Sequence, residues 1–341
     1  MSYGSGKIGD ILLSVRDLHV EFRTGSSVVN AVNGVTFDVR NGETLAVLGE
    51  SGSGKSITFE AILGILDSPP GKVTGGEAVF EGSNLLELSR SQRRAICGNR
   101  IGMIFQDPLS ALNPVYTAGW QIAEMFRVHR GLSVADANQR AVDLLKLVGM
   151  PDAERRAKSY PHEFSGGMRQ RLVIAMALAV NPVLVIADEP TTALDVTVEA
   201  QILALLKSLQ KQNCVGLVII THSMGVVAEI ADRVCVMYAG RIMETADVRA
   251  IFAETAHPYT LGLLNSNPSS MSGDRLTPII GQPPDLASIP PGCPFHPRCT
   301  LAKDKCRTEE PKLQQGPSQL HSVACHFFEK VVADRESKVS Q

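Results

Sequence analysis

Eight consecutive residues of the sequence fit a complete phosphate-binding loop, G-x-x-x-x-G-K-[ST]. The apolar run 44–48 precedes the loop, as expected of a strand buried on both faces, and helix-like apolar spacing follows it over 57–66. Glycines let such a loop aim its N–H groups at phosphate oxygens, while the lysine would reach the β- and γ-phosphates and the serine hydroxyl would bind Mg²⁺. The alternative is a glycine-rich turn with a chance lysine. The loop consists of Gly49, Glu50, Ser51, Gly52, Ser53, Gly54, Lys55 and Ser56.

Two carboxylates follow a second apolar run, 183–187, which is also expected to be a buried strand. Charged groups at such a place are costly unless they are used. In phosphoryl transfer the first, Asp188, would hold Mg²⁺, and the second, Glu189, would polarise the water that attacks the γ-phosphate. The alternative is a capped strand end with solvated acids.

Two further polar side chains, Gln106 and His222, follow the expected strands 101–105 and 216–220. The carboxyl ends of strands in an open α/β sheet face the ligand crevice. There Gln106 would reach Mg²⁺ or the attacking water, and His222 would contact the γ-phosphate. Taken alone, the first is typical of an ordinary loop glutamine and the second of a satisfied structural histidine.

Three small residues, Ser165, Gly166 and Gly167, come shortly before an apolar helical segment. Small residues at a helix N-terminus form an anion-binding site, although a plain helix cap has the same composition. Phe22 follows the first expected strand, where its ring would stack on an adenine. A half-buried strand aromatic is the alternative reading of its spacing.

The segments between these residues indicate an α/β fold. Residues 11–48 have strand character, whereas 117–180 carries helical spacing and predicts an α-helical insertion. Asp195 precedes the amphipathic helix 196–210, whose apolar stripe is expected in the core rather than in a site. The stripe consists of Ile202, Leu205, Leu206 and Leu209.

Composition sets wider limits. A chain of 341 residues is long enough for two domains or for one with an appendage. Its formal net charge of -2 gives no long-range reason to expect nucleic acid. No segment approaches ~20 uninterrupted apolar residues, and the start, 1–10, lacks the charged and apolar regions of a signal peptide. We therefore expect a protein that stays in the cytosol.

In this order, the motifs resemble the nucleotide-binding subunit of an ABC transporter, over residues 11 to about 250. The signature differs from the usual Leu-Ser-Gly-Gly-Gln at Phe164 and Met168, while its serine and backbone donors remain. The resemblance implies a Walker A loop at 49–56, an adenine-stacking Phe22, the Q-loop Gln106, the signature Ser165, Gly166 and Gly167, the Walker B Asp188, the catalytic Glu189, the D-loop Asp195 and the switch His222.

The family fold implied is a P-loop cassette. It combines a RecA-like α/β core with a mainly parallel sheet, an antiparallel β subdomain and an α-helical subdomain, here about 117–180, that bears the signature. Two such cassettes are implied to sandwich two ATP molecules head to tail, each held by the Walker A loop of one chain and the signature of the other. A second ATPase subunit is therefore expected, either a distinct homologous chain or an identical one.

The run His257-Pro258-Tyr259-Thr260-Leu261 and the Pro- and Cys-rich tail resemble the oligopeptide/dipeptide branch of importers, which also includes nickel and glutathione systems. The resemblance implies a nucleotide-binding domain, 1–255, and a C-terminal extension, 256–341. It implies ATP-driven peptide uptake at the cytoplasmic face of the membrane, with two integral permease subunits, an extracytoplasmic substrate-binding protein and no nucleic acid. The alternatives are nickel or glutathione uptake, or a soluble ABC ATPase acting on nucleic acid or the ribosome.

Four of the seven cysteines fall in the last fifty residues, separated by five, six and eighteen residues: Cys293, Cys299, Cys306 and Cys325. The absence of a CxxC pair disfavours a zinc ribbon, although His296, His321 and His326 leave mixed zinc ligation open. Four thiolates suit a [4Fe–4S] cluster, which some ATPases of the resembled branch carry here, and unliganded thiols are the third alternative. The isolated cysteines are expected in the core: Cys97, Cys214 and Cys235.

Overall fold

The computed structural model describes residues 7–25, 27–192, 194–266 and 278–339. Most of the polar start, 1–6, lies outside the described residues, as does residue 193 beside Asp195. The chain divides into two compact units, each assembled from separate stretches. The signature unit comprises Met1–Leu12, Val39–Glu43 and Leu88–Ile220, and the phosphate-loop unit comprises Leu13–Asp38, Thr44–Glu87 and Thr221–Gln341.

The signature unit is built on parallel strands β6 (Ile101–Ile104), β7 (Leu184–Asp188) and β8 (Gly216–Thr221), in the order β6-β7-β8. Every residue of β7 and β8 is buried, as continuous apolar runs require when both faces of a parallel strand are covered. Because parallel strands end at the same edge, the residues after β6 and β7 are brought to one side of the sheet.

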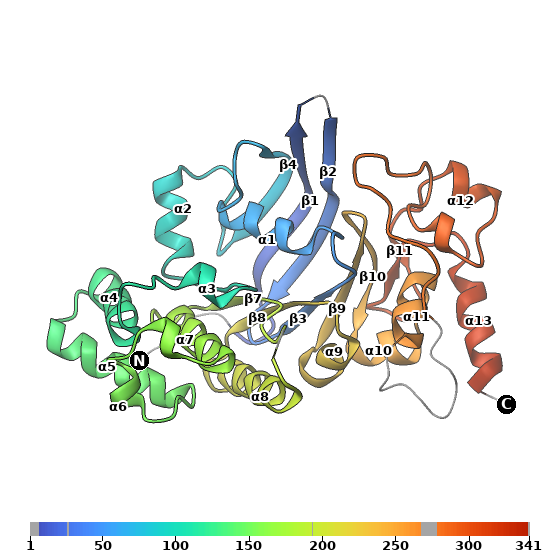
Figure 1. Cartoon of the computed structure of the whole chain (residues 1–341). Coiled ribbons are helices and arrows are strands. Elements are labelled where there is room, and N and C mark those ends of the chain that lie inside the picture. The colour runs from blue at the N-terminus through green and yellow to red at the C-terminus, as the bar shows by residue number, and fades with distance from the viewer. Residues whose placement is uncertain (1–6, 26, 193, 267–277, 340–341) are drawn as a thin grey trace. The chain divides into compact units, whose positions relative to one another are not determined.

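Helices make up most of the rest of this unit, and their starts follow the expected cap chemistry. The side chains of Thr117 and Ser133 accept hydrogen bonds from the backbone N–H groups of Trp120 and Asp136 at two helix N-termini. Figure 1 shows the helices of the expected insertion, α4 to α7, side by side. The helices are α2 (Arg90–Cys97), α3 (Pro108–Ala111), α4 (Ala118–Arg130), α5 (Val134–Leu147), α6 (Ala153–Arg156), α7 (Gly166–Leu178) and α8 (Val196–Asn213).

Helix α8 buries nearly the stripe that was predicted. Ile202, Leu206 and Leu209 are buried, but the fourth buried position is Leu203, whereas Leu205 is only half-buried. The buried face of α8 is therefore rotated slightly from the predicted one, toward Leu203, which adjoins Ile202 and Leu206 on the helix surface.

The phosphate-loop unit contains two sheets. One is antiparallel, in the order β2-β1-β4-β5, and the other runs β11-β12-β10-β9-β3, with β3 parallel to β9. The strands are β1 (Ile11–Thr24), β2 (Ser27–Arg40), β3 (Thr44–Leu48), β4 (Gly71–Phe80), β5 (Ser83–Asn84), β9 (Arg233–Tyr238), β10 (Arg241–Asp247), β11 (Gln314–Gln315) and β12 (Ser322–Val323). The helices are α1 (Lys55–Leu63), α9 (Met224–Ile230), α10 (Val248–Ala253), α11 (Pro258–Asn265), α12 (Asp304–Thr308) and α13 (Phe328–Val339).

The core of this unit joins β3 and β9 to the segments that follow β10. Helices α9 and α10 contact these strands, and Figure 1 shows α10 and α11 beside them. Tyr238 on β9, Tyr259 on α11 and Phe295 form one aromatic group, with ring centroids 4.7 to 5.3 Å apart. The last described segments are thus packed into the same core as the strand before the phosphate loop.

A fully buried carboxylate strengthens this attachment. Glu244 on β10 accepts hydrogen bonds from the backbone N–H groups of Ala256 and His257, and its Oε1 lies 2.7 Å from Nε2 of His321. A buried charge is tolerated only when it is paired and hydrogen-bonded, so these partners fix the chain on both sides of the gap 267–277 to β10.

The isolated cysteines correct one expectation. Cys235 is buried on β9, as predicted, whereas Cys97 is half-buried and Cys214 is exposed. Cys214 follows α8 as its C-cap, in the left-handed conformation with φ 51°, and this helix end is exposed. Its neighbours in sequence were therefore a poor guide to its burial.

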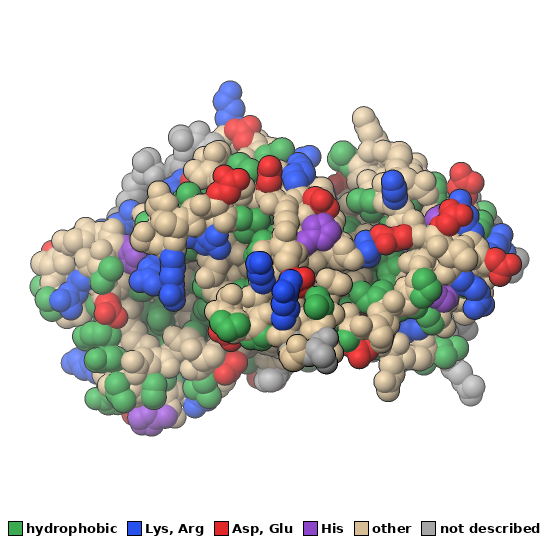
Figure 2. Space-filling model, turned by 90° about the horizontal axis from the view of Figure 1, so that it is seen from above, with side chains coloured by type: hydrophobic (Ala, Val, Ile, Leu, Met, Phe, Trp, Pro, Cys, Tyr) green, Lys and Arg blue, Asp and Glu red, His purple; other side chains and the backbone are tan. Residues whose placement is uncertain are grey.

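Among the described residues, no helix is long and apolar enough to cross a membrane. Figure 2 shows acidic and basic side chains interspersed over the described part of one face.

Candidate functional site

The phosphate loop joins β3 to α1 and depends on glycine at two positions. Gly54 is the N-cap of α1 with φ 95°, and a Cβ there would lie 2.4 Å from the backbone oxygen of Ala31. A Cβ on Gly49 would lie 2.3 Å from the backbone oxygen of Met237. Both distances are far below contact, so the loop can approach its neighbours this closely only without side chains.

Lys55 is buried, and its side chain folds back onto the first residues of the phosphate loop. Its ammonium donates to the backbone oxygens of Gly49 at 2.8 Å and Glu50 at 2.9 Å. The hydroxyl of Ser53 is buried and has no hydrogen-bond partner among the described residues. A cradle with an oriented ammonium and an unsatisfied hydroxyl suits an anionic ligand, so these residues fit a nucleotide phosphate.

Two other candidates of the phosphate-loop unit lie at the ends of strands. Phe22 is half-buried near the end of β1, opposite Gly71 of β4, and His222 is exposed immediately after β8. Ser56, the Mg²⁺ candidate, is half-buried in the first turn of α1, and Ser51 and Gly52 are exposed. Phe22 and His222 are thus at least partly accessible to a ligand.

In the signature unit, the structure brings Gln106 and Glu189 together. Nε2 of Gln106 donates to Oε2 of Glu189 at 2.9 Å, and the hydroxyl of Thr192 donates to the same oxygen at 3.0 Å. Gln106 follows β6 and Glu189 follows β7, so the pairing results from the shared strand edge. The amide and the hydroxyl orient the carboxylate, which is the arrangement needed to hold an attacking water.

The backbone of Glu189 is itself unusual. Its φ is 42°, in the left-handed region that side chains rarely adopt, and its N–H donates to the backbone oxygen of Ile220 on β8 at 2.9 Å. Asp188 before it is the last residue of β7 and is 5% exposed. The turn thereby separates two neighbouring carboxylates into a buried one and a half-buried one.

The signature residues begin α7. Ser165 is the N-cap residue; it is exposed, and its side chain makes no capping hydrogen bond. A Cβ on Gly167 would lie 2.8 Å from a methyl of Val198. Phe164 is 3% exposed, with the guanidinium of Arg156 5.9 Å from the centre of its ring. The departure at Phe164 is therefore absorbed into the packing, and Ser165 stays accessible.

The predicted site is divided between the two units. Asp195 caps α8, with its Oδ1 accepting from the N–H of Val198 at 2.9 Å. The signature unit contains this aspartate, the signature, Gln106, Asp188 and Glu189. The phosphate loop, Phe22 and His222 belong to the other.

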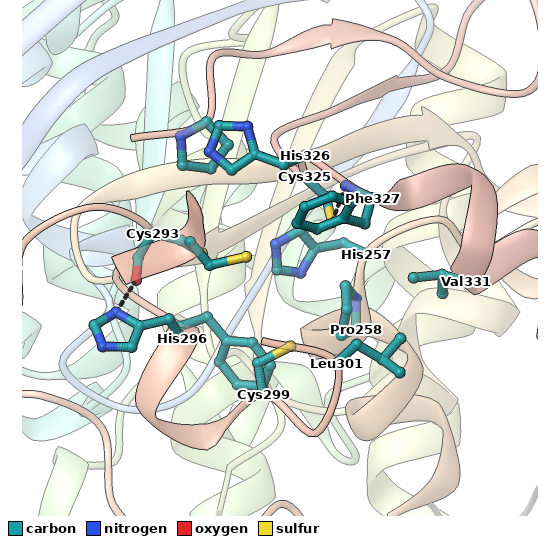
Figure 3. Close-up of a pocket in the computed structure, with 13 residues that line it drawn as sticks. His257, Pro258, Cys293, His296, Cys299, Leu301, Cys325, His326, Phe327 and Val331 are labelled. Atoms are coloured by element: carbon teal, nitrogen blue, oxygen red, sulfur yellow. Dashed lines mark hydrogen bonds between the residues drawn. The ribbon is translucent and has the colours of Figure 1, made fainter. Parts of the chain in front are cut away.

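The four C-terminal cysteines line one pocket of the phosphate-loop unit. The space around these residues that contains no atoms amounts to about 380 Å³, a figure that includes open solvent and is not an enclosed cavity. Figure 3 shows the sulfurs of Cys293, Cys299 and Cys325 directed toward the space between them, and Cys306 lines the same pocket. Burial raises the pKa of Cys293 to about 12 and that of Cys325 to about 11, because it disfavours the charged thiolate relative to the neutral thiol.

The histidines considered as zinc ligands have other partners. Nδ1 of His296 contacts the backbone oxygen of Cys293 at 3.0 Å, Nε2 of His321 is paired with Glu244, and Nε2 of His326 contacts the backbone oxygen of Glu309 at 3.0 Å. Among the described residues, no three His, Cys, Asp or Glu side chains are grouped so that they could hold a single metal ion.

Known proteins resemble the chain over most of its length. Residues 32–192 match the family model "ABC transporter", and residues 243–306 match "Oligopeptide/dipeptide transporter, C-terminal region". The dipeptide transport ATP-binding protein DppD of Bacillus subtilis (strain 168) is 50% identical over 92% of this chain and 94% of its own. The oligopeptide transport ATP-binding protein OppD of the same organism is 52% identical over 89% and 85%. The chain belongs to the oligopeptide/dipeptide family of ABC transporter ATP-binding subunits.

Solved structures agree with the fold of this ABC subunit. A dimeric ATP-binding cassette in a post-hydrolysis state with ADP and Pi is 28% identical, with a TM-score of 0.64, over 70% of this chain and 99% of that one. A dimeric bacterial ABC transporter cassette matches with 29% identity and a TM-score of 0.63, over the same shares. The expected cassette fold is therefore confirmed.

Sequence reasoning missed two side chains at the phosphate loop of the ABC subunit. The hydroxyl of Tyr259 accepts a hydrogen bond from the backbone N–H of Glu50 at 2.9 Å. Arg298 forms a two-pronged ion pair with the Glu50 carboxylate, at 2.5 and 2.9 Å. Tyr259 lies in the run that suggested the importer branch, but its role in the loop had no local signal. Arg298 lies 248 residues from Glu50, so only the folded chain reveals the pair.

Proposed function

We propose that this ABC subunit hydrolyses ATP to drive the uptake of peptides across the cytoplasmic membrane. The observation that carries the proposal is the identity of about 50% to DppD and OppD over nearly the whole chain, including the oligopeptide/dipeptide region 243–306. The buried Lys55 and the glycine cradle supply the phosphate site that such a role needs.

The residues of the chain have separate tasks in this reaction. Lys55 and the N–H groups of the phosphate loop hold the β- and γ-phosphates, and Ser56, Asp188 and Gln106 are the candidates for holding Mg²⁺. When bound there, Mg²⁺ would neutralise the charge that develops on the phosphate oxygens. Glu189 accepts a proton from the attacking water and is oriented by Gln106. His222 contacts the γ-phosphate, and Phe22 stacks on the adenine.

We assign residues 1–255 to the nucleotide-binding domain and 256–341 to the C-terminal extension. A complete site needs the signature of a second ATPase subunit, either a homologous chain or a copy of this one, while Ser165, Gly166, Gly167 and Asp195 here complete the site of the partner. The exposed position of Ser165 at the start of α7 supports this use. The assembly docks on two permease subunits at the cytoplasmic face, with an extracytoplasmic binding protein delivering the peptide.

The proposal is tested by purifying the subunit with the proteins that accompany it and reconstituting them in lipid vesicles. ATP-dependent uptake of radiolabelled dipeptides or longer peptides is expected. Uptake of nickel or glutathione in place of peptides would change the substrate, and copurification with nucleic acid or ribosomes rather than permeases would overturn the transport role.

We also propose that the four-cysteine pocket holds a [4Fe–4S] cluster. Such a cluster takes four cysteine thiolates, one on each iron, so its ligands are spread more widely than those of a single ion. A tetrahedral zinc site would draw its sulfurs to ~2.3 Å from one ion, whereas a cluster distributes them over four irons. The pocket lined by Cys293, Cys299, Cys306 and Cys325 supports the larger group.

A further inference from the structure

The phosphate loop contains an acidic residue where its ligand is strongly anionic. Glu50 is the second residue of the loop, and its backbone oxygen accepts from the Lys55 ammonium at 2.9 Å. Its side chain is 26% exposed. A carboxylate this close to a triphosphate site repels the ligand unless its charge is neutralised.

Arg298 provides that neutralisation from the far end of the chain. Its Nη1 and Nη2 donate to the two carboxylate oxygens of Glu50, and its side chain is only 5% exposed. A guanidinium in this fork geometry makes the strongest kind of carboxylate pair. The ion pair with Glu50 raises the pKa of Arg298 above its ordinary value, so its positive charge is secure.

The guanidinium is also held in place independently of Glu50. Its Nε donates to the backbone oxygen of Ile280 at 3.2 Å, and Nη1 lies 3.3 Å from the Tyr238 hydroxyl. The carbon at its centre lies 5.8 and 5.9 Å from the ring centres of Tyr238 and Phe295. Because these contacts orient Arg298 beforehand, the pairing with Glu50 requires little further ordering.

We propose that Arg298 is a positioning residue for ATP binding: it neutralises Glu50 and thereby makes the phosphate loop electrostatically competent for a nucleoside triphosphate. The inference rests on the proposed ATP-binding function. Arg298 ends a short 3-10 turn, His296–Arg298, directly before Cys299 of the pocket. The charge balance of the loop therefore depends on the folded state of the cysteine-rich segment.

This role predicts opposite effects for the two partners of one ion pair. Arg298→Gln leaves the Glu50 carboxylate uncompensated and should weaken binding of a fluorescent ATP analogue by about tenfold. Glu50→Gln removes the repulsive charge, leaves the Arg298 cation uncompensated and should therefore tighten binding. The double variant Glu50→Gln/Arg298→Gln should return to within about threefold of the wild type, because it has no unpaired charge.

A matched control separates charge from simple bracing. Like Arg298–Glu50, the ion pair Arg241–Glu310 attaches a C-terminal segment to the rest of the unit. It does so at β10 and does not involve the phosphate loop. Arg241→Gln should therefore leave analogue affinity unchanged. Thermal unfolding of each full-length variant is measured in parallel, and Arg298→Lys, which keeps the charge but not the fork, should bind within about threefold of the wild type.

The possible outcomes are distinct. Wild-type affinity in Arg298→Gln would overturn the inference, as would equal weakening by Glu50→Gln, because a brace needs both partners. If Arg298→Gln does not fold, the affinities of Glu50→Gln and Arg298→Lys still decide. Failure of the wild-type protein to bind the analogue would overturn the proposed function itself. If the wild type binds normally and Arg298→Gln binds equally well, only this inference is overturned.

Discussion

The carboxylate of Glu189 is placed by its neighbours before any nucleotide arrives. Gln106 and Thr192 both donate to its Oε2, and its left-handed backbone turns it away from Asp188. The residue closest to the proposed chemistry therefore has a backbone conformation that side chains rarely adopt, as is frequent at functional sites.

Replacement of Glu189 separates binding from hydrolysis. Glu189→Gln keeps the size of the side chain but loses the proton acceptor, so ATP turnover in the assembled complex should fall ~10²–10⁴-fold while ATP binding persists. Steady-state phosphate release and analogue binding measure the two effects. Near-normal hydrolysis would contradict the assignment of Glu189 as the general base.

His257 makes the stability of the protein depend on pH. Its Nδ1 accepts from the N–H of Tyr259 at 3.0 Å, and burial lowers its pKa from 6.5 to about 4 in the folded protein. As the pH falls, the unfolded chain therefore binds this proton first. The stabilisation is complete above pH 6.5 and is lost between pH 6.5 and about 4.

A variant without this histidine should lose less stability than the wild type when the pH is lowered. His257→Asn keeps a cap acceptor, so wild-type stability should decrease by about 2 kcal/mol more than that of the variant between pH 7.5 and pH 5. Denaturant unfolding at both pH values measures the difference. The exposed His162, changed to Asn, is the control, and an equal pH response of all three proteins would contradict the prediction.

At the scale of elements, the phosphate loop and α1 act as one piece. Gly54 caps α1 in a conformation with φ 95° and contacts the β2 backbone at Ala31, so the loop is confined between two strands. Gly52 in the same loop has φ 78°, but a Cβ placed there would have no neighbouring atom within 4 Å. Both glycines thus have positive φ, but only at Gly54 would an added Cβ collide with a neighbouring strand.

This difference predicts different effects of the same substitution. Gly54→Ala must displace the backbone and should abolish detectable ATP-analogue binding. Gly52→Ala meets only the left-handed backbone penalty, of ~1–2 kcal/mol, and should reduce affinity without abolishing it. Analogue titration of both variants, with circular dichroism to check folding, is the measurement. Equal losses would show that crowding at Ala31 is unimportant.

The elements that could be predicted from sequence were those with local patterns. The apolar runs of β3, β7 and β8, the glycine loop and the polar residues after the strands indicated both the fold class and most candidate residues. The pair Glu50–Arg298 could not be predicted, because its two residues meet only through the packing of Phe295 and Tyr238. Cys214 was misjudged because helix-end geometry, not neighbouring hydrophobicity, sets its exposure.

At the scale of the whole molecule, the cysteine pocket is the feature most open to a direct test. Anaerobically purified full-length protein should contain about four irons and four acid-labile sulfides per chain, as one [4Fe–4S] cluster requires. Changing Cys299 to Ser should reduce both, whereas Cys214→Ser, at an exposed site outside the pocket, should not. Zinc without iron or sulfide would overturn the cluster proposal.

The pairing of β3 with β9 also constrains when the molecule can acquire its fold. Leu45 on β3 lies beside Arg233 on β9, and the partners of Glu244 on β10 extend from Ala256 to His321. During synthesis, the strand that leads into the phosphate loop must therefore wait until β9, Arg233–Tyr238, has left the ribosome. Nascent chains halted before residue 233 would lack a partner for one edge of β3, so this protein should acquire nucleotide affinity late and depend on chaperones until then.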